Sequence, residues 1–264
     1  MMRKKAFAAI LSLFALLFLL TSCGKKPDAE TYETLSGLHG ELENLTRGEL
    51  GFRMEASFRD PETGIGGVLY SIDGETRYDT EGRTAWQRFT ATRLGATVTG
   101  EEYYENGVKT HVEGGQVTLF SVEPEGLFGV FPYRMPPLPA LSELKSLQTE
   151  ANGGGTLYTL VTAAGQKRLI EEIWGLDLYA LAGVTVPDRE KESYGDVTYT
   201  WSVAEGSIRT LYAELTVSLF EKTGYTPGYN AKEDDGRLDL TIRTRITFRD
   251  AGETVEIPAY EGSE

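Results

Sequence analysis

The side chains that most often do chemistry are few in this chain of 264 residues. It contains one cysteine and two histidines, against 40 acidic and 26 basic residues. A single cysteine cannot form an internal disulfide, an iron–sulfur site or a thiolate zinc cluster, and two histidines leave little room for a histidine-based metal site. The sequence also lacks GxSxG, HExxH, phosphate-loop and dinucleotide-binding motifs. We therefore expect a protein that is not an enzyme and that holds no metal or cofactor.

The remaining polar candidates give the same expectation. His39 falls in a predicted helix and His111 in a predicted strand beside Glu113, and neither has a serine-centred or carboxylate-centred context. The acidic run 232–236 lacks the alternating ligands and the distal glutamate of a calcium loop, so it predicts a solvated turn. Adjacent carboxylates are expected by chance among 40 acids, and glycosidase chemistry would need two of them placed together in space.

The position of the cysteine is informative. Basic residues 3–5 precede an uncharged apolar or small run, 6–20, which is shorter than the roughly 20 residues that span a bilayer and fits the apolar region of a signal peptide. Leu20-Thr21-Ser22-Cys23 follows directly and resembles the bacterial lipobox, in which a small residue precedes a cysteine that becomes lipidated and forms the mature N-terminus. The alternative is an uncleaved N-terminal anchor with an incidental cysteine.

The lipobox resemblance implies a location and a domain layout. Residues 1–22 would be a signal peptide, 23–30 a lipidated tether and 31–264 a single β-rich domain. Cys23 would carry a covalent diacylglycerol, whose two acyl chains suffice for stable anchoring. The domain would then lie on the extracytoplasmic face of the cell membrane. A net charge of −14 disfavours nucleic acid as a partner. Removal of residues 1–22, with their three basic side chains, would make the charge −17, which would hold the domain off an anionic membrane surface.

Apolar and aromatic residues supply the candidate ligand contacts. The segment 126–141 is rich in proline yet apolar, so it could form a lid over a cavity or touch the bilayer. The alternative is a connection that packs into the core and shields a sheet edge. Three tryptophans could line a pocket, although such residues also commonly fill cores. The candidate ligand-binding residues are Leu127, Phe128, Phe131, Tyr133, Met135, Trp86, Trp174 and Trp201.

The elements that must position these residues are mostly strands. Apolar residues alternate with polar ones in 197–203, 211–219 and 238–248, which predicts three long strands with one apolar face each. A similar alternation in 50–58 predicts another. Helical spacing of leucines predicts an amphipathic helix at 31–45. Further strands are predicted at 67–73, 76–79, 85–94, 97–104, 108–113, 116–122, 157–161 and 255–257, and further helices at 140–148 and 166–175.

These elements predict an α+β, mainly β fold: a curved antiparallel half-barrel sheet with a few helices on its concave face. The lipobox, leading helix, proline-rich loop and paired terminal strands together resemble the lipoprotein-carrier-like group of LolA and LppX type. Segments 101–108, 156–161 and 248–258 resemble the hairpins and the middle unit of Gram-positive lipoproteins of this group. The resemblance implies a hydrophobic cavity for acyl chains or lipids, and no catalytic residues.

Two functional hypotheses follow. In the first, the protein is a non-enzymatic lipoprotein whose half-barrel binds a lipid or another hydrophobic small molecule. In the second, the core is filled, and the polar sheet face or a sheet edge binds a protein partner at the cell surface. A structure separates the two most directly, because they differ in whether the concave face is open or filled.

Overall fold

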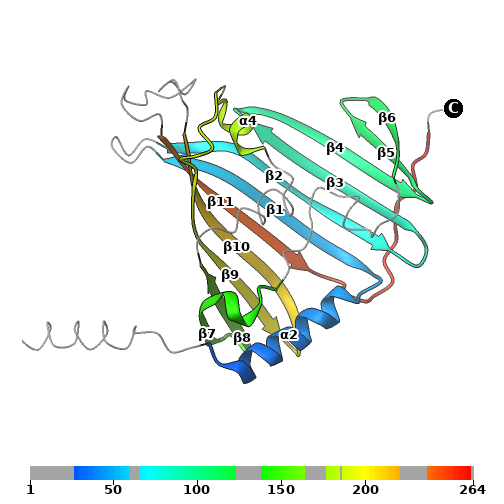
Figure 1. Ribbon diagram of the computed structural model, residues 1–264. Helices are drawn as coiled ribbons and strands as arrows, with labels where there is room; N and C mark the ends of the chain where they lie inside the picture. The colour runs from blue at the N-terminus through cyan, green and yellow to red at the C-terminus, as the bar shows by residue number, and fades with distance from the viewer. Residues whose placement is uncertain are drawn as a thin grey trace, which may run out of the picture.

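The computed structural model describes residues 27–59, 66–122, 138–163, 177–184, 186–220 and 237–262. Strands dominate this part of the chain (Figure 1). The helical elements are α2 (Ala29–Glu43), α4 (Leu178–Ala182) and the 3-10 turn η2 (Leu141–Glu143). The strands are β1 (Arg47–Arg59), β2 (Gly66–Asp79), β3 (Thr84–Arg93), β4 (Ala96–Glu105), β5 (Val108–Glu113), β6 (Gln116–Ser121), β7 (Leu144–Asn152), β8 (Gly155–Thr162), β9 (Ser193–Ala204), β10 (Ser207–Phe220) and β11 (Arg237–Phe248).

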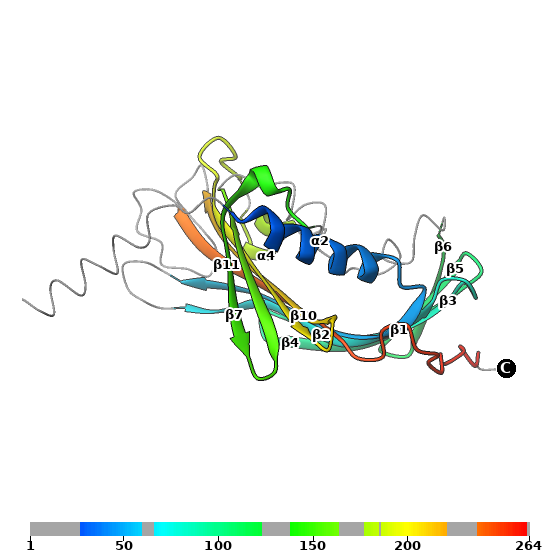
Figure 2. The ribbon, with the colours of Figure 1, turned by 90° about the horizontal axis from the view of Figure 1, so that it is seen from below.

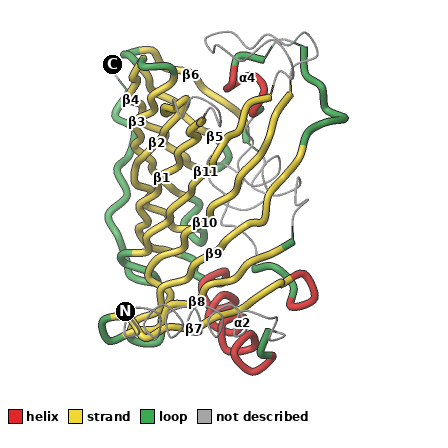
Figure 3. The backbone as a smooth tube through the Cα atoms, turned by 90° about the vertical axis from the view of Figure 1, so that its left-hand side faces the viewer, coloured by secondary structure: helices red, strands yellow, loops and turns green. Residues whose placement is uncertain are grey.

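All eleven strands form one antiparallel sheet in the order β6-β5-β4-β3-β2-β1-β11-β10-β9-β8-β7. The first and last strands of the chain meet in its middle, where Phe52 of β1 lies opposite Ile246 of β11. Two meanders therefore flank the β1–β11 seam, and β6 and β7 form the open edges. The sheet is strongly curved (Figures 2 and 3). This confirms the predicted fold class, a mainly β half-barrel with few helices.

Period-2 alternation explains why one face of the sheet is buried. On β10, Leu211, Ala213, Leu215, Val217 and Leu219 are at most 2% exposed, whereas the residues between them are half-buried or exposed. The register of the sheet aligns the buried residues of neighbouring strands, since Leu211 lies opposite Trp201 on β9 and Ile246 on β11. We call the buried side the inner face and the opposite side the outer face.

The two described helices lie on the concave side of the sheet (Figure 2). Helix α2 begins at the N-cap Asp28, whose carboxylate accepts a hydrogen bond from the Thr31 N–H at 3.0 Å. Its buried residues are Leu35, His39 and Leu42, and it packs over β10. Helix α4 begins at Asp177, ends at Gly183 with φ 72°, and packs over β2.

Several sequence-based boundaries are wrong. Residues 140–148 form not a helix but η2 and the start of β7, because the Gly153-Gly154 turn pairs Leu144–Asn152 with β8 and tertiary pairing overrides local propensity. Residues 255–257 form no strand. The two strands predicted at 67–73 and 76–79 are a single strand, β2, that runs through Gly74. The helix predicted at 166–175 lies outside the described residues.

Candidate functional site

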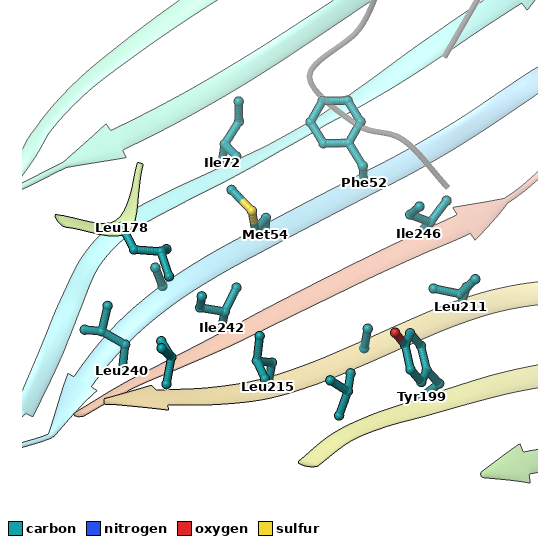
Figure 4. Close-up of a cluster of buried hydrophobic side chains, with 14 of the residues drawn as sticks. Phe52, Met54, Ile72, Leu178, Tyr199, Leu211, Leu215, Leu240, Ile242 and Ile246 are labelled. Carbon is teal, nitrogen blue, oxygen red and sulfur yellow. The ribbon is translucent and has the colours of Figure 1, made fainter. Parts of the chain in front are cut away.

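The inner face carries a continuous apolar surface made by the central strands (Figure 4). Its side chains come from β1, β2, β9, β10 and β11, and each is at most 4% exposed. Leu178 of α4 packs into the same buried cluster. We name this surface the inner floor; its members are Phe52, Met54, Ile72, Tyr199, Leu211, Leu215, Ile242 and Ile246.

The described helices reach the inner floor at opposite ends of the strands (Figure 1). At one end, the His39 ring of α2 meets the Trp201 indole edge-on, with ring centroids 6.3 Å apart. At the other end, a guanidinium N–H of Arg93 on β3 donates to the Ala180 carbonyl of α4 at 3.0 Å. The strands and these two helices thus border an apolar surface whose side chains are almost completely buried.

Within the described residues, some polar atoms of the inner face have no hydrogen-bond partner. The Tyr199 hydroxyl, the Trp201 indole N–H and the Thr244 hydroxyl are buried and unpaired. Burial also raises the pKa of Tyr199 well above its ordinary value, so this phenol stays protonated. Buried polar atoms of native proteins are usually hydrogen-bonded. These three groups are therefore exceptions to the usual pairing of buried polar atoms.

A polar cluster lies on the inner face farther toward the β6 edge. Gln87 of β3 and Glu102 of β4 are direct cross-strand neighbours and are 0% and 6% exposed. The Thr76 hydroxyl donates to Gln87 Oε1 at 3.2 Å, and Lys109 Nζ donates to Glu102 Oε1 at 3.2 Å. His111 Nδ1 lies 3.0 Å from the same Glu102 oxygen. Gln87 Nε2 and Glu102 Oε2 have no hydrogen-bond partner in the described part of the chain.

Sequence reasoning did not identify this cluster. Gln87 and Glu102 occupy inner-face positions of their strands, where alternation would place apolar side chains. That interruption is a usable signal, but it needs the register of β3 against β4 to show that the two residues are neighbours. His111, which was not expected to be catalytic, lies between two carboxylates, with Nε2 3.6 Å from Glu113 Oε2.

The structure separates the predicted tryptophans. Trp201 is fully buried in the inner face and stacks on Tyr199, with ring centroids 5.4 Å apart. Trp86 faces the other way, between the guanidinium groups of Arg77 and Arg88 at 5.4 and 5.2 Å from its ring centre. Trp86 and Trp201 therefore cannot line the same pocket. The other candidates lie outside the described residues: Cys23, Leu127, Phe128, Phe131, Tyr133, Met135 and Trp174.

The described residues contain no helix long and apolar enough to cross a membrane. Within the same part of the chain, no group of three or more histidine, cysteine, aspartate or glutamate side chains is arranged to hold a metal ion.

Fold and site together define a mainly β half-barrel with an apolar inner face and a polar outer face. No family model and no curated protein matches the chain. Among solved structures, it is similar to LprF from Mycobacterium bovis, with 12% identity, a TM-score of 0.41, and coverage of 89% of this chain and 99% of that one. A structure described as an oleoyl thioesterase from Lactobacillus plantarum has 12% identity and a TM-score of 0.13, and the match covers 84% of each chain. Both TM-scores are low, and neither similarity says what this chain binds.

Proposed function

We propose that this chain is a lipoprotein of the extracytoplasmic membrane face, anchored through Cys23, that binds a lipid or another hydrophobic molecule against the inner floor. The observation that carries the proposal is the continuous apolar face of a curved, open sheet, whose described helices approach it from opposite ends. A flat sheet could bury such a face only against another layer. A curved sheet can also wrap a ligand.

The polar atoms of the inner face support a binding role over a purely structural one. A core evolved only for packing gains nothing from an unpaired Tyr199 hydroxyl or Trp201 indole N–H, because a buried polar group without a partner costs about 1–3 kcal/mol. A bound molecule with a hydrogen-bonding group would satisfy them. We propose no catalytic step, because no motif in the sequence supplies a nucleophile with its base.

Fluorescence quenching tests the ligand site, because the two described tryptophans lie on opposite faces. In a Trp174→Phe background, a fatty acid brominated along its acyl chain should quench Trp201 and leave Trp86 unchanged. The matched variants Trp201→Phe and Trp86→Phe report the two faces separately. Equal quenching of both residues, or none, would contradict binding at the inner floor. Extraction of the purified protein and mass spectrometry of the extract would then identify the natural ligand.

Anchoring is tested separately. Wild-type protein and the Cys23→Ala variant are expressed in bacteria grown with a labelled fatty acid. We expect label and membrane association in the wild type only. Persistent label in the variant would rule out Cys23 as the attachment site.

A second candidate, a protein-interaction module, is favoured by one observation. Edge strand β6 is exposed along its whole length, carries no charged residue and presents Val117, Leu119 and Phe120 at 47%, 66% and 45% exposure. Uncharged apolar edges readily pair with another extended segment. A pull-down from cell-surface extracts, compared with a Leu119→Lys variant, tests this function; absence of a specific partner would dismiss it.

A further inference from the structure

The outer face contains a hollow that the proposed ligand site does not explain. It has a volume of about 420 Å³ and lies over the middle of the sheet, on β11, β1, β2 and β3. Its charged lining consists of Arg53, Arg88, Arg245, Arg249, Asp73 and Glu75. Four guanidinium groups and two carboxylates thus line the hollow, in a protein whose net charge is −14. Three of the arginines also contact a carboxylate beside the lining: Arg53 lies 3.5 Å from Glu55, Arg88 lies 2.8 Å from Glu101 and Arg249 lies 2.8 Å from Glu49.

Two of these arginines are placed against each other. Arg53 of β1 lies directly opposite Arg245 of β11 in the register of the sheet. Like charges at directly opposite positions destabilise a sheet. Arg53 is 3.5 Å from Glu55, whereas Arg245 makes no ion pair or hydrogen bond within the described part of the chain. The arrangement therefore has an unfavourable interaction that an anion between the two guanidinium groups would remove.

The hollow also contains hydrogen-bond donors besides Arg53 and Arg245. Thr90 and Thr247 add hydroxyl groups to its lining. Arg249 contacts Glu49 at 2.8 Å and lies 3.6 Å from Glu75, contacts that occupy one nitrogen of its guanidinium. Gly51 forms part of the lining, and a Cβ there would come within 3.3 Å of Arg249 Nη2. The missing side chain keeps the space next to this guanidinium open.

We propose that this hollow binds a small soluble oxyanion with two or more negative charges, through carboxylate or phosphate oxygens. The planar fork of arginine matches these groups with paired, charge-assisted hydrogen bonds. A volume of about 420 Å³ lies within the range of small-molecule sites. A free anion is favoured over an anionic membrane surface, because the net charge of −14 repels an extended negative surface while the local arginines attract a small ion.

Thermal unfolding in low-salt buffer with citrate, inorganic phosphate or chloride at matched ionic strength tests the proposal. We expect citrate and phosphate to raise the melting temperature of the wild type above the effect of chloride. In Arg53→Gln and Arg245→Gln, calorimetric affinity for citrate should fall by about tenfold, the loss of about one charge-assisted contact. Arg243→Gln is the matched control, because Arg243 is also on β11 but pairs with Glu214 at 2.8 Å and is not part of the lining.

The sign of the stability change caused by Arg245→Gln distinguishes a binding site from an ordinary network of surface ion pairs. Without an added anion, Arg245→Gln should be at least as stable as the wild type, because it removes the opposition to Arg53. A loss of stability together with an unchanged citrate response would overturn the proposal, as would equal effects of chloride and citrate. Sedimentation with phosphatidylglycerol vesicles completes the test: vesicle binding that Arg245→Gln abolishes, with no response to citrate, would assign the site to a membrane instead. None of these results bears on the inner floor.

Discussion

The two faces of the sheet are made by the same strands, yet different interactions hold them. On β11, Ile242 is fully buried in the inner floor, and the next residue, Arg243, extends from the outer face to Glu214 at 2.8 Å. Inner-face residues gain stability from loss of apolar surface to water, which depends little on pH or salt. Outer-face residues interact through exposed ion pairs, which contribute little and are screened.

The inner face mainly stabilises the fold, whereas the outer face can hold groups that recognise a ligand. Because the inner face supplies most of the folding free energy, the outer face is free to hold an unfavourable pair such as Arg53 and Arg245. The inner face contains an exception of its own, because Gln87 and Glu102 place unpaired polar groups at positions where apolar groups would stabilise the fold more. The Arg53–Arg245 pair lies in the hollow where we propose an anion, and Gln87 and Glu102 belong to the polar cluster of the inner face.

The largest expected difference between the faces comes from truncating neighbouring residues of β11. Ile242→Ala should lower the free energy of unfolding by about 2–5 kcal/mol, because it removes buried methyl groups and leaves a cavity. Thr241→Ala, one residue away on the outer face, should change it by less than about 1 kcal/mol. Denaturant unfolding measures both. Similar losses for the two variants would mean that the faces do not differ in the way described.

Two glycines give a sharper comparison. At Gly74 an added Cβ would collide with the Arg88 backbone carbonyl and come within 2.6 Å of the Phe52 ring, so Gly74→Ala should destabilise the protein by about 1–3 kcal/mol. At Gly51 the nearest atom to an added Cβ is Arg249 Nη2 at 3.3 Å, on a half-exposed side chain that can move, and the nearest backbone atom, the Gly74 carbonyl oxygen, is at an ordinary contact distance of 3.8 Å. Gly51→Ala should therefore change stability by less than about 1 kcal/mol while it weakens citrate binding. Equal destabilisation would contradict this account of the hollow.

The polar cluster can be tested by removing both members of one hydrogen bond. Gln87→Leu alone leaves the Thr76 hydroxyl without its acceptor and should destabilise by about 1 kcal/mol. The double variant Thr76→Val, Gln87→Leu should be close to wild type or slightly more stable, because it removes the Thr76 hydroxyl that the single variant leaves unpaired, together with the unpaired Gln87 amide N–H. A double variant less stable than the single one would show that these polar groups contribute to folding.

Sequence alone predicted the inner face well because alternation is a local signal. The apolar positions of β9, β10 and β11 were visible residue by residue, and burial confirms them. The sites were harder to predict because they depend on register. Arg53 and Arg245 are far apart in the chain and become neighbours only because β1 pairs with β11. Trp86 could not be assigned to a face until its strand was placed opposite Arg77.

The smallest predicted effect concerns pH and the carboxylate of Glu49 on the outer face. This carboxylate accepts hydrogen bonds from Arg77 at 3.0 Å and Arg249 at 2.8 Å. Burial acts to raise the pKa of Glu49, but the two arginines outweigh it and hold this pKa below its ordinary value of 4.5. The unfolded chain therefore binds the proton more readily, so the contribution of Glu49 is present above about pH 4.5 and is lost as the pH falls through the lower folded value.

Glu49→Gln should accordingly be less stable than the wild type at pH 6, by less than about 1 kcal/mol, and the difference should shrink toward pH 3. Ile242→Ala, measured in parallel, should keep its full loss at both pH values, because burial of an isoleucine involves no proton. If the Glu49→Gln difference stayed constant with pH while the Ile242→Ala loss changed, the assignment of electrostatic interactions to the outer face and apolar burial to the inner face would have to be reversed.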